Sequence, residues 1–381
     1  MDLPYKKRTW GNFSFFLFTG IVGTLGAPFY ISHYGISPFM IALSLFYLTA
    51  TGLSITMGYH RLFSRSTYKA HPLAQSFFLF FGAAAFEQSA LKWSSQHRDH
   101  HQYLDTERDP YSVKQGFWHA HIGWLVNWKQ PNHYLNVHDL QKNSMVMSQH
   151  KYYGLWALVA GVVVPMLFGA LAGEALAAFI IAVCFRIAFV QHTTFCVNSV
   201  CHWMGNKTYD SESTARDHWL VAILTFGEGY HNFHHRFPSD YRNGIRWYHW
   251  DPSKWGITLL RTVGLAYDLH QTPYFRILHA RLTADKQHTH NALSTSFGLN
   301  PAFTKIWEQI ELKYGIVQKA LVRFEIAARE YQSVTESKFK AAALTKLHQR
   351  RVFFKNRKRQ WVAFTTKTRA NFSMPLAFNS I

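Results

Sequence analysis

Histidines in close groups are the residues of this sequence best suited to chemistry. Two triplets share one spacing, and two single histidines lie near the ends of long apolar stretches. The eight residues are His60, His97, His100, His101, His202, His231, His234 and His235. Positions i, i+3 and i+4 share one face of a helix, so we expect each triplet to converge on one point. A lone histidine is usually a packed side chain, but the repeated spacing makes coincidence a poor explanation.

Neutral imidazole is the commonest nitrogen ligand of transition metals in proteins. The histidines therefore predict metal binding. Eight rings are too many for one ion, because a structural zinc takes four ligands and a catalytic zinc keeps one position open. Two metals, each with room for water or an oxygen species, fit the number better. The all-nitrogen set does not itself select iron, because copper and zinc bind such ligands more tightly.

The elements that must hold these histidines are strongly apolar. Hydrophobic residues make up 48% and charged residues 16% of the 381 residues, against about 25% charged in soluble domains. Four stretches approach the roughly 20 residues that a helix needs to cross a bilayer. They are residues 13–30, 36–59, 152–173 and 175–197. The sequence predicts an all-α integral membrane protein with four transmembrane helices and a cytosolic helical cap. Its three cysteines cannot build a disulfide framework.

Basic residues next to these stretches predict the orientation in the membrane. Three precede the first stretch at 6–8 and three follow the second at 61–69, whereas the connections 33–38 and 173–174 have none. Since basic loops stay in the cytoplasm, we expect both termini and the histidines on the cytosolic side of a bacterial inner membrane or the endoplasmic reticulum. A further apolar segment near 73–91 is expected to be an interfacial or re-entrant helix.

These features divide the chain into six expected parts. They are a cytosolic N-terminus (1–12), transmembrane helices 1 and 2 (13–59), a first cap segment (60–151), transmembrane helices 3 and 4 (152–197), a second cap segment (198–280) and a basic helical C-terminal extension (281–381).

The extension carries much of the positive charge. It holds 18 Lys and Arg against 6 Asp and Glu, which gives +12 of the total +19. Apolar residues between Ile306 and Phe324 recur at near-helical spacing and predict an amphipathic helix. The basic cluster 355–359 followed by Trp361 suits anionic lipid, at about 1 kcal/mol per charge, although a solvated helix face explains it equally. Nucleic acid is not an expected partner, because no recognition module accompanies the charge.

The histidine motifs resemble those of the membrane fatty-acid desaturases of the acyl-CoA (stearoyl-CoA, delta-9) type. The similar segments are Gly58-Tyr59-His60-Arg61-Leu62-Phe63-Ser64, Trp93 to His101, and Gly227-Glu228-Gly229-Tyr230-His231-Asn232-Phe233-His234-His235-Arg236-Phe237-Pro238. The segment from Val197 through Asn198 to His202 is similar to a further ligand region of the family. The resemblance covers roughly residues 10 to 270, and the basic extension lies outside it.

This resemblance implies a stem of four membrane helices under a cytosolic cap that holds two non-haem iron ions. The eight histidines would be the iron ligands, and Asn198 would hold a metal-bound water. The implied reaction uses O2 to remove two hydrogens from an acyl CH2–CH2 and forms a C=C bond. A long acyl chain fits between the helices with its head left in water, and candidate residues along this passage are Trp93, Phe195, Gln88 and Lys114. Ordinary aromatic packing explains Trp93 and Phe195 equally well.

The resemblance also implies partners. These are a long-chain acyl substrate carried by CoA or acyl-carrier protein, membrane lipid, and a separate electron donor such as cytochrome b5, ferredoxin or rubredoxin. No haem-like context surrounds the scattered histidines of the extension.

One position departs from the family's first motif: Arg65 stands where the family has a second histidine. A guanidinium is not a usual metal ligand. Either the centre lacks one ligand, or His71 or water replaces it, or the activity is altered or lost.

Ser95, Gln96 and Gln115 also replace residues that the acyl-CoA enzymes often carry. Weaker binding of the CoA phosphates would follow if those positions matter.

Three other residues near the apolar stretches invite a functional interpretation. Arg186 lies within the fourth stretch, where a charge is a functional or interhelical candidate; a structural tie is the milder interpretation. For His192 a packed, hydrogen-bonded side chain is an equal alternative to a functional one, and Cys201 is not expected to be a ligand.

Alternatives to a desaturase remain open at this point. A di-iron hydroxylase of lipids or alkanes shares the histidine chemistry. A non-catalytic relic is compatible with Arg65, and a metal transporter fits poorly because the histidines lie outside the stretches.

Overall fold

The computed structural model describes residues 5–129, 133–297 and 301–372. The chain folds into two compact units. The first comprises Met1–Asn206 with Ser213–Gln271, and the second comprises Lys207–Glu212 with Thr272–Ile381. The second unit thus begins earlier in the chain than the expected extension at 281.

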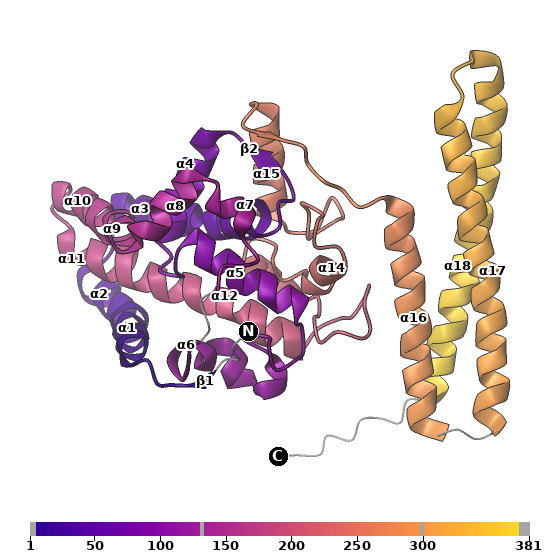
Figure 1. Cartoon of the computed structure of the whole chain (residues 1–381), viewed down its shortest axis with the longest axis horizontal. Helices are drawn as coiled ribbons and strands as arrows, with labels where there is room; N and C mark the ends of the chain where they lie inside the picture. Colours follow the sequence, from indigo (N-terminus) through magenta and orange to yellow (C-terminus); the bar gives the residue numbers. More distant parts are fainter. Residues whose placement is uncertain (1–4, 130–132, 298–300, 373–381) are drawn as a thin grey trace. The chain divides into compact units, whose positions relative to one another are not determined.

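Helices make up most of the regular secondary structure of the first unit, and loops connect them (Figure 1). Its α-helices are α1 (Trp10–Gly20), α2 (Gly26–Tyr34), α3 (Pro38–Leu53), α4 (Pro72–Ala83), α5 (Ala90–Gln102), α6 (Trp124–Val126), α7 (His138–Gln141), α8 (Ser144–Lys151), α9 (Tyr153–Leu158), α10 (Val164–Leu171), α11 (Ala175–Ala177), α12 (Arg186–Trp203), α13 (Trp219–Leu224), α14 (His231–Arg236) and α15 (Pro252–Thr262). Wider π-helical turns continue several of these: η1 (Ile21–Leu25), η2 (Ser54–Ser64), η4 (His119–Gly123), η5 (Val159–Val163) and η6 (Ala178–Phe185), while η3 (Val113–Gln115) is a 3-10 turn.

Strands are short in the described residues. Strand β1 (Tyr5–Lys6) pairs antiparallel with β3 (Trp128–Lys129), and Tyr5 lies opposite Lys129. Strand β2 (Lys69–Ala70) pairs antiparallel with β4 (Ala266–Tyr267), and Lys69 lies opposite Tyr267.

Within the described residues, 4 continuous helical segments are long and apolar enough to cross a membrane. They are Trp10–Tyr34, Pro38–Ser64, Tyr153–Leu171 and Ala175–Trp203. This confirms the expected all-α membrane protein with four spanning helices. The helix α4 is apolar but shorter, and the interfacial or re-entrant placement of the segment near 73–91 stays a prediction.

Small residues let the spanning helices approach closely. A Cβ atom on Gly23 in η1 would lie 2.7 Å from Cα of Phe185 in η6. A Cβ on Gly169 in α10 would clash with Cβ of Ala178. Lipid tails are as apolar as the helices, so close packing of this kind is a main source of helix association in a bilayer.

Arg186 ties the fourth span to its neighbours. Its guanidinium donates to the carbonyl oxygens of Ala182 at 2.9 Å and Gly161 at 2.6 Å, and also to that of Ala84. These acceptors belong to three separate segments of the chain. The structural interpretation of Arg186 therefore fits its contacts, because backbone carbonyls satisfy its buried donors.

A second buried arginine joins the end of the second span to the cap. Arg61 in η2 donates to Glu228 at 2.9 Å and to Asp251 at 3.0 Å. Its Nη1 also donates to the carbonyl oxygen of Tyr241 at 2.8 Å. Asp251 caps α15 by accepting from the backbone N–H of Lys254 at 2.9 Å. One buried cation between two carboxylates thus joins η2, which carries His60, to the segment of Glu228 that leads into the second triplet and to the start of α15.

The second unit is a bundle of three long helices, α16 (Tyr274–Phe297), α17 (Pro301–Ser333) and α18 (Ser337–Phe372), which run side by side in Figure 1. The predicted amphipathic face of α17 lies inside this bundle, with Ile310, Val317 and Leu321 buried against the other helices. Trp361 is 2% exposed. The expectation that Trp361 is available to a lipid surface is wrong, because the bundle uses it as core.

We predict that Arg61→Met destabilises the protein strongly. The change leaves Glu228 and Asp251 buried without their cation, which typically costs about 3 to 5 kcal/mol. Thermal unfolding in detergent measures the effect. The matched control is Lys69→Met, because Lys69 pairs with Asp268 at 2.9 Å but both side chains are exposed, and such pairs contribute about 0 to 1 kcal/mol. Equal losses from the two variants would contradict the prediction.

Candidate metal centre

Four separate helical segments deliver the eight histidines. His60 lies in η2 at the end of the second span, and His202 lies near the end of α12, which completes the fourth span. The helix α5 carries one triplet and α14 begins at His231, the first residue of the other. Ser89 caps α5 by accepting from the backbone N–H of Lys92 at 3.3 Å. The ligand-bearing helices therefore start or end at the site.

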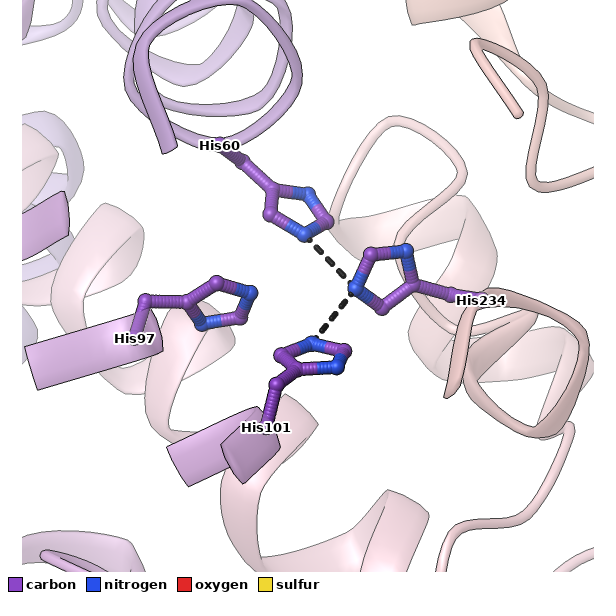
Figure 2. Close-up of side chains that lie close together, drawn as sticks. All are labelled: His60, His97, His101 and His234. Carbon is purple, nitrogen blue, oxygen red and sulfur yellow. Dashed lines mark hydrogen bonds between the residues drawn. The ribbon is translucent and has the colours of Figure 1, made fainter. Parts of the chain in front are cut away.

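The rings gather into two groups of four. The first group consists of His60, His97, His101 and His234, and Figure 2 shows its rings pointing toward one centre. Nε2 of His234 lies 3.0 Å from Nε2 of His60 and 2.8 Å from Nε2 of His101. In this group, one nitrogen of each ring lies within 4.8 Å of the others.

The second group consists of His100, His202, His231 and His235. Nε2 of His231 lies 3.0 Å from Nε2 of His202 and 3.0 Å from Nε2 of His235. Nε2 of His100 lies 3.3 Å from Nε2 of His235.

Neither triplet converges on one point, so that expectation is wrong. Each triplet divides: the residues at i and i+4 share one group and the residue at i+3 joins the other. With about 100° per residue, i+4 lies roughly 40° to one side of i, and i+3 lies roughly 60° to the other side. Each helix therefore contributes ligands to both groups. The helix α5 gives two histidines to the first group and one to the second, and α14 gives one to the first and two to the second.

The donor sets fit metal ions. Four nitrogens at about 2.1 Å from a tetrahedral ion lie roughly 3.4 Å apart, close to the spacing of the Nε2 atoms. Nε2 of His97 is buried and has no hydrogen-bond partner among the described residues, although it belongs to the first group. A buried polar atom without a partner is costly, and a metal ion there would satisfy it.

Burial keeps these imidazoles neutral. Removal from water, followed mainly by the neighbouring rings, lowers the pKa of His97, His101, His231, His234 and His235 well below the usual range. A neutral ring is the form that binds metals. The site is therefore prepared for cations at neutral pH.

Carboxylates support individual rings from the side opposite the metal positions. Nδ1 of His60 contacts Glu228 at 2.6 Å, and Nδ1 of His100 contacts Asp109 at 2.8 Å. Nδ1 of His202 contacts Oγ1 of Thr214 at 2.8 Å, and this hydroxyl donates to Asp105 at 2.6 Å. Such outer partners orient the ring and raise its basicity.

Sequence reasoning did not single out these outer partners as site residues. Glu228 lies three residues before His231, and Asp109 follows the first triplet by eight. The sequence does contain one indication of such partners, namely an acidic residue close to each histidine triplet. It does not tell which ring the carboxylate supports, because Glu228 contacts His60 from a distant part of the chain.

A pocket leads from the histidines into the spanning helices. Its lining includes His60, His97 and His231 together with Asn198. Its walls are mainly apolar and come from the first, second and fourth spans, with Phe15, Phe16, Leu48, Ile55, Phe189, Val190 and Phe195 among them. The arrangement places an apolar passage directly against the metal positions.

The four expected passage residues take different positions. Trp93, Phe195 and Gln88 line the pocket, whereas Lys114 is not among its lining residues in the described part of the chain. Trp93 stacks on His97 with ring centroids 4.8 Å apart. Its indole N–H donates to Glu87 at 3.3 Å.

Arg65 and His71 lie in different surroundings. Arg65 follows η2 and donates from Nε to the carbonyl oxygen of Pro238 at 3.5 Å. His71 is exposed and caps α4, since its Nδ1 accepts from the backbone N–H of Leu73 at 3.2 Å. It belongs to neither group of four, so the structure gives no support to His71 as a replacement ligand.

His192 and Cys201 behave as packed residues. Nδ1 of His192 contacts Nε2 of His121 at 3.1 Å, and Nδ1 of His121 contacts the hydroxyl of Ser199 at 3.0 Å. The thiol of Cys201 is buried and faces the carbonyl oxygen of Gly229 at 3.9 Å.

The chain is similar in sequence to known desaturases. Residues 37–254 match the family model described as fatty acid desaturase. The "Probable acyl-CoA desaturase" of Schizosaccharomyces pombe is 44% identical over 236 residues, which is 61% of this chain and 49% of that protein. The "Acyl-CoA desaturase 1" of Saccharomyces cerevisiae is 40% identical over 271 residues, 70% of this chain and 53% of that protein. The chain spans about half the length of these two relatives.

A shorter relative is covered almost completely. The "sn-1 stearoyl-lipid 9-desaturase" of Anabaena variabilis is 34% identical over 262 residues, which is 68% of this chain and 92% of that protein. The region matched by the family model, residues 37–254, contains all eight histidines.

We predict that Asp109→Asn weakens metal binding about 10- to 100-fold, because His100 loses the carboxylate that orients it. Metal content after dialysis against a graded series of chelator measures the change. Asp268→Asn is the matched control, since Asp268 is exposed and pairs with Lys69. Equal metal retention by the two variants would show that Asp109 does not support the centre.

Glu87 generates a prediction on pH dependence. Burial raises the pKa of this carboxyl from 4.5 to about 8, despite hydrogen bonds from Thr194 and Trp93. A raised acid pKa in the folded state means that stability is lost as pH rises from about 4.5 toward 8, on the order of 3 to 5 kcal/mol. Glu87→Gln mimics the neutral acid and removes this loss. Its unfolding temperature should exceed that of the wild type at pH 9 but not at pH 5. Glu336→Gln, at an exposed position, should show no such difference.

Proposed function

The chain belongs to the fatty acid desaturase family, and from this premise we propose that it desaturates a long-chain fatty acyl substrate. The proposed substrate is an acyl-CoA, with the double bond introduced in the manner of a delta-9 enzyme. The names of the yeast relatives support the CoA carrier, and the name of the Anabaena variabilis relative supports position 9.

The single observation that carries this proposal is the pocket. It joins buried histidines to an apolar passage between membrane helices. A saturated chain has no polar group to recognise, so it must be held by apolar contact along its length. The passage supplies such contact and keeps water away from the carbon atoms beside the metal positions.

Two iron ions are the proposed cofactors, held by the two groups of four histidines. Bound there, they would supply the oxidation of an acyl CH2–CH2 by O2, with two electrons from a donor completing the reduction of O2 to water. The donor sets fit a transition metal, and the choice of iron rests on family membership.

The residues around the centre have separate proposed roles. Trp93 fixes His97 by stacking and borders the passage. Asn198 faces the same pocket as His60 and His231, a position suited to holding a water near the metals. Phe195 and the phenylalanines of the first span border the passage, where the depth that a chain can reach would decide which carbons react.

Partners and orientation are proposed on the same basis. A separate carrier, such as cytochrome b5, ferredoxin or rubredoxin, would deliver the electrons. The basic segments at 6–8 and 61–69 support termini and a metal centre on the cytosolic side, where a water-soluble carrier and a CoA headgroup are available.

Expression in a host that lacks unsaturated fatty acids tests the proposal. We expect a new monounsaturated acid in the lipid profile, and loss of this product in His100→Ala and His234→Ala, one variant for each histidine group. An alcohol in place of the alkene would identify a hydroxylase. Absence of any product in a folded, metal-loaded protein would overturn the proposed reaction.

Arg65→His belongs beside the wild type in that experiment. If the wild type is inactive and this variant forms the alkene, the missing family ligand is the defect. If both form it, the two groups of four are sufficient.

A further inference from the structure

The helices of the three-helix bundle differ in length. The helix α16 has 24 residues, whereas α17 has 33 and α18 has 36. At 1.5 Å per residue, α16 is roughly 14 and 18 Å shorter than these two neighbours. Figure 1 shows α17 and α18 extending past the start of α16. The third side of the α17–α18 pair is therefore not covered by α16 along its whole length.

A cleft with a volume of about 380 Å³ lies where α16 begins, since Tyr274, the first residue of this helix, is part of its lining. The other lining residues come from α17 and α18. The volume falls within the range of small-molecule sites, about 300 to 1,000 Å³. All lining residues belong to the second unit, so the cleft is separate from the pocket beside the histidines.

One part of the lining is apolar. Phe324 and Phe354 are buried, with ring centroids 5.8 Å apart. Leu344 and Leu347 add aliphatic surface, and the side chain of Leu344 is exposed. A hydrocarbon chain in the cleft would remove this surface from water, which is favourable.

The other part of the lining is cationic. Arg351, Lys355 and Lys358 lie four and three residues apart on α18, so they share one helix face with the apolar lining residues of the same helix. The lining contains no carboxylate in the described part of the chain. Arg351 and Lys355 form no ion pair among the described residues.

The acidic residues of α17 that lie close to this lining in sequence have other partners. Glu325 pairs with Arg329 at 2.6 Å, and Glu330 pairs with Lys346 at 2.6 Å. An anion from outside the bundle can therefore reach the two unpaired cations without displacing a carboxylate.

We propose that this cleft binds a long-chain acyl-CoA, at a site separate from the pocket beside the histidines. The acyl chain lies on the phenylalanines and leucines, and the CoA phosphates contact the cations. Several cations along one helix face suit a head with several phosphates better than a single carboxylate. The inference goes beyond the proposed reaction, because α17 and α18 lie outside the residues matched by the family model.

A photoreactive palmitoyl-CoA with a diazirine near the end of its acyl chain tests this inference. The full chain is placed in phosphatidylcholine nanodiscs, irradiated with the probe and digested, and mass spectrometry locates the label. We expect label on peptides that contain residues 324–328 and 344–354. Palmitoyl-CoA should compete with the probe more strongly than palmitate or free CoA, because each of these lacks one half of the ligand.

Two double variants separate the cleft from the overall charge of α18. Arg351→Gln with Lys355→Gln should weaken labelling of the bundle about 25-fold, or roughly fivefold for each charge removed. Lys340→Gln with Lys367→Gln is the matched control, since both lysines are exposed on α18 and neither lines the cleft. Circular dichroism checks that each variant is folded.

Label confined to the spanning helices, or an equal loss of bundle label in the two double variants, would overturn the inference. Competition by phosphatidylserine in the nanodisc as strong as that by palmitoyl-CoA would also overturn it and identify a bilayer lipid as the occupant. Labelling needs no turnover, so its result is distinct from that of the lipid profile. Bundle label without alkene would reject the reaction alone, and alkene formation without bundle label would reject this inference alone.

Discussion

The structure depends on holding eight imidazoles close together in two groups, with most of the rings buried. Such rings cannot all be protonated at close range, and each buried nitrogen needs a partner. Buried carboxylates and a buried arginine meet this requirement. Glu228 and Asp109 contact ring nitrogens, and Arg61 sits between Glu228 and Asp251. Arg61 holds Glu228, which in turn contacts His60, so one ligand of the first group and the packing of the cap depend on the same buried network.

The membrane helices are continuous with this network. η2 extends the second span to His60 and Arg61, and α12 extends the fourth span to His202. The ends of two spans are therefore themselves parts of the centre. An apolar pocket that runs along the same helices meets the rings without any intervening domain. The arrangement joins a substrate dissolved in lipid to a site that needs polar ligands, because each helix is apolar in one part and ligand-bearing in the next.

The sequence predicts the identity of the histidines better than their grouping. Their spacing and their places beside apolar stretches indicate metal ligands and four spans. The division into two groups could not be derived, because it depends on how α5 and α14 face each other. His97 and His100 share a helix face by spacing, yet they serve different groups. The support of His60 by Glu228 joins residues far apart in the chain, and no local pattern encodes such a contact. Arg65 stood out only against a family motif, and its surroundings required the structure.

The three-helix bundle uses its apolar faces differently from the histidine-bearing unit. An amphipathic basic helix invites a membrane interpretation, but here the apolar faces of α16, α17 and α18 cover one another. The helix α18 carries Lys and Arg along its length and has no Asp or Glu, while Phe354 and Trp361 are in the core. Other apolar side chains of α18 stay exposed beside this charge, among them Phe339, Leu344 and Val362. Electrostatic association weakens with salt, whereas insertion of apolar residues does not, and that difference separates the two kinds of membrane contact.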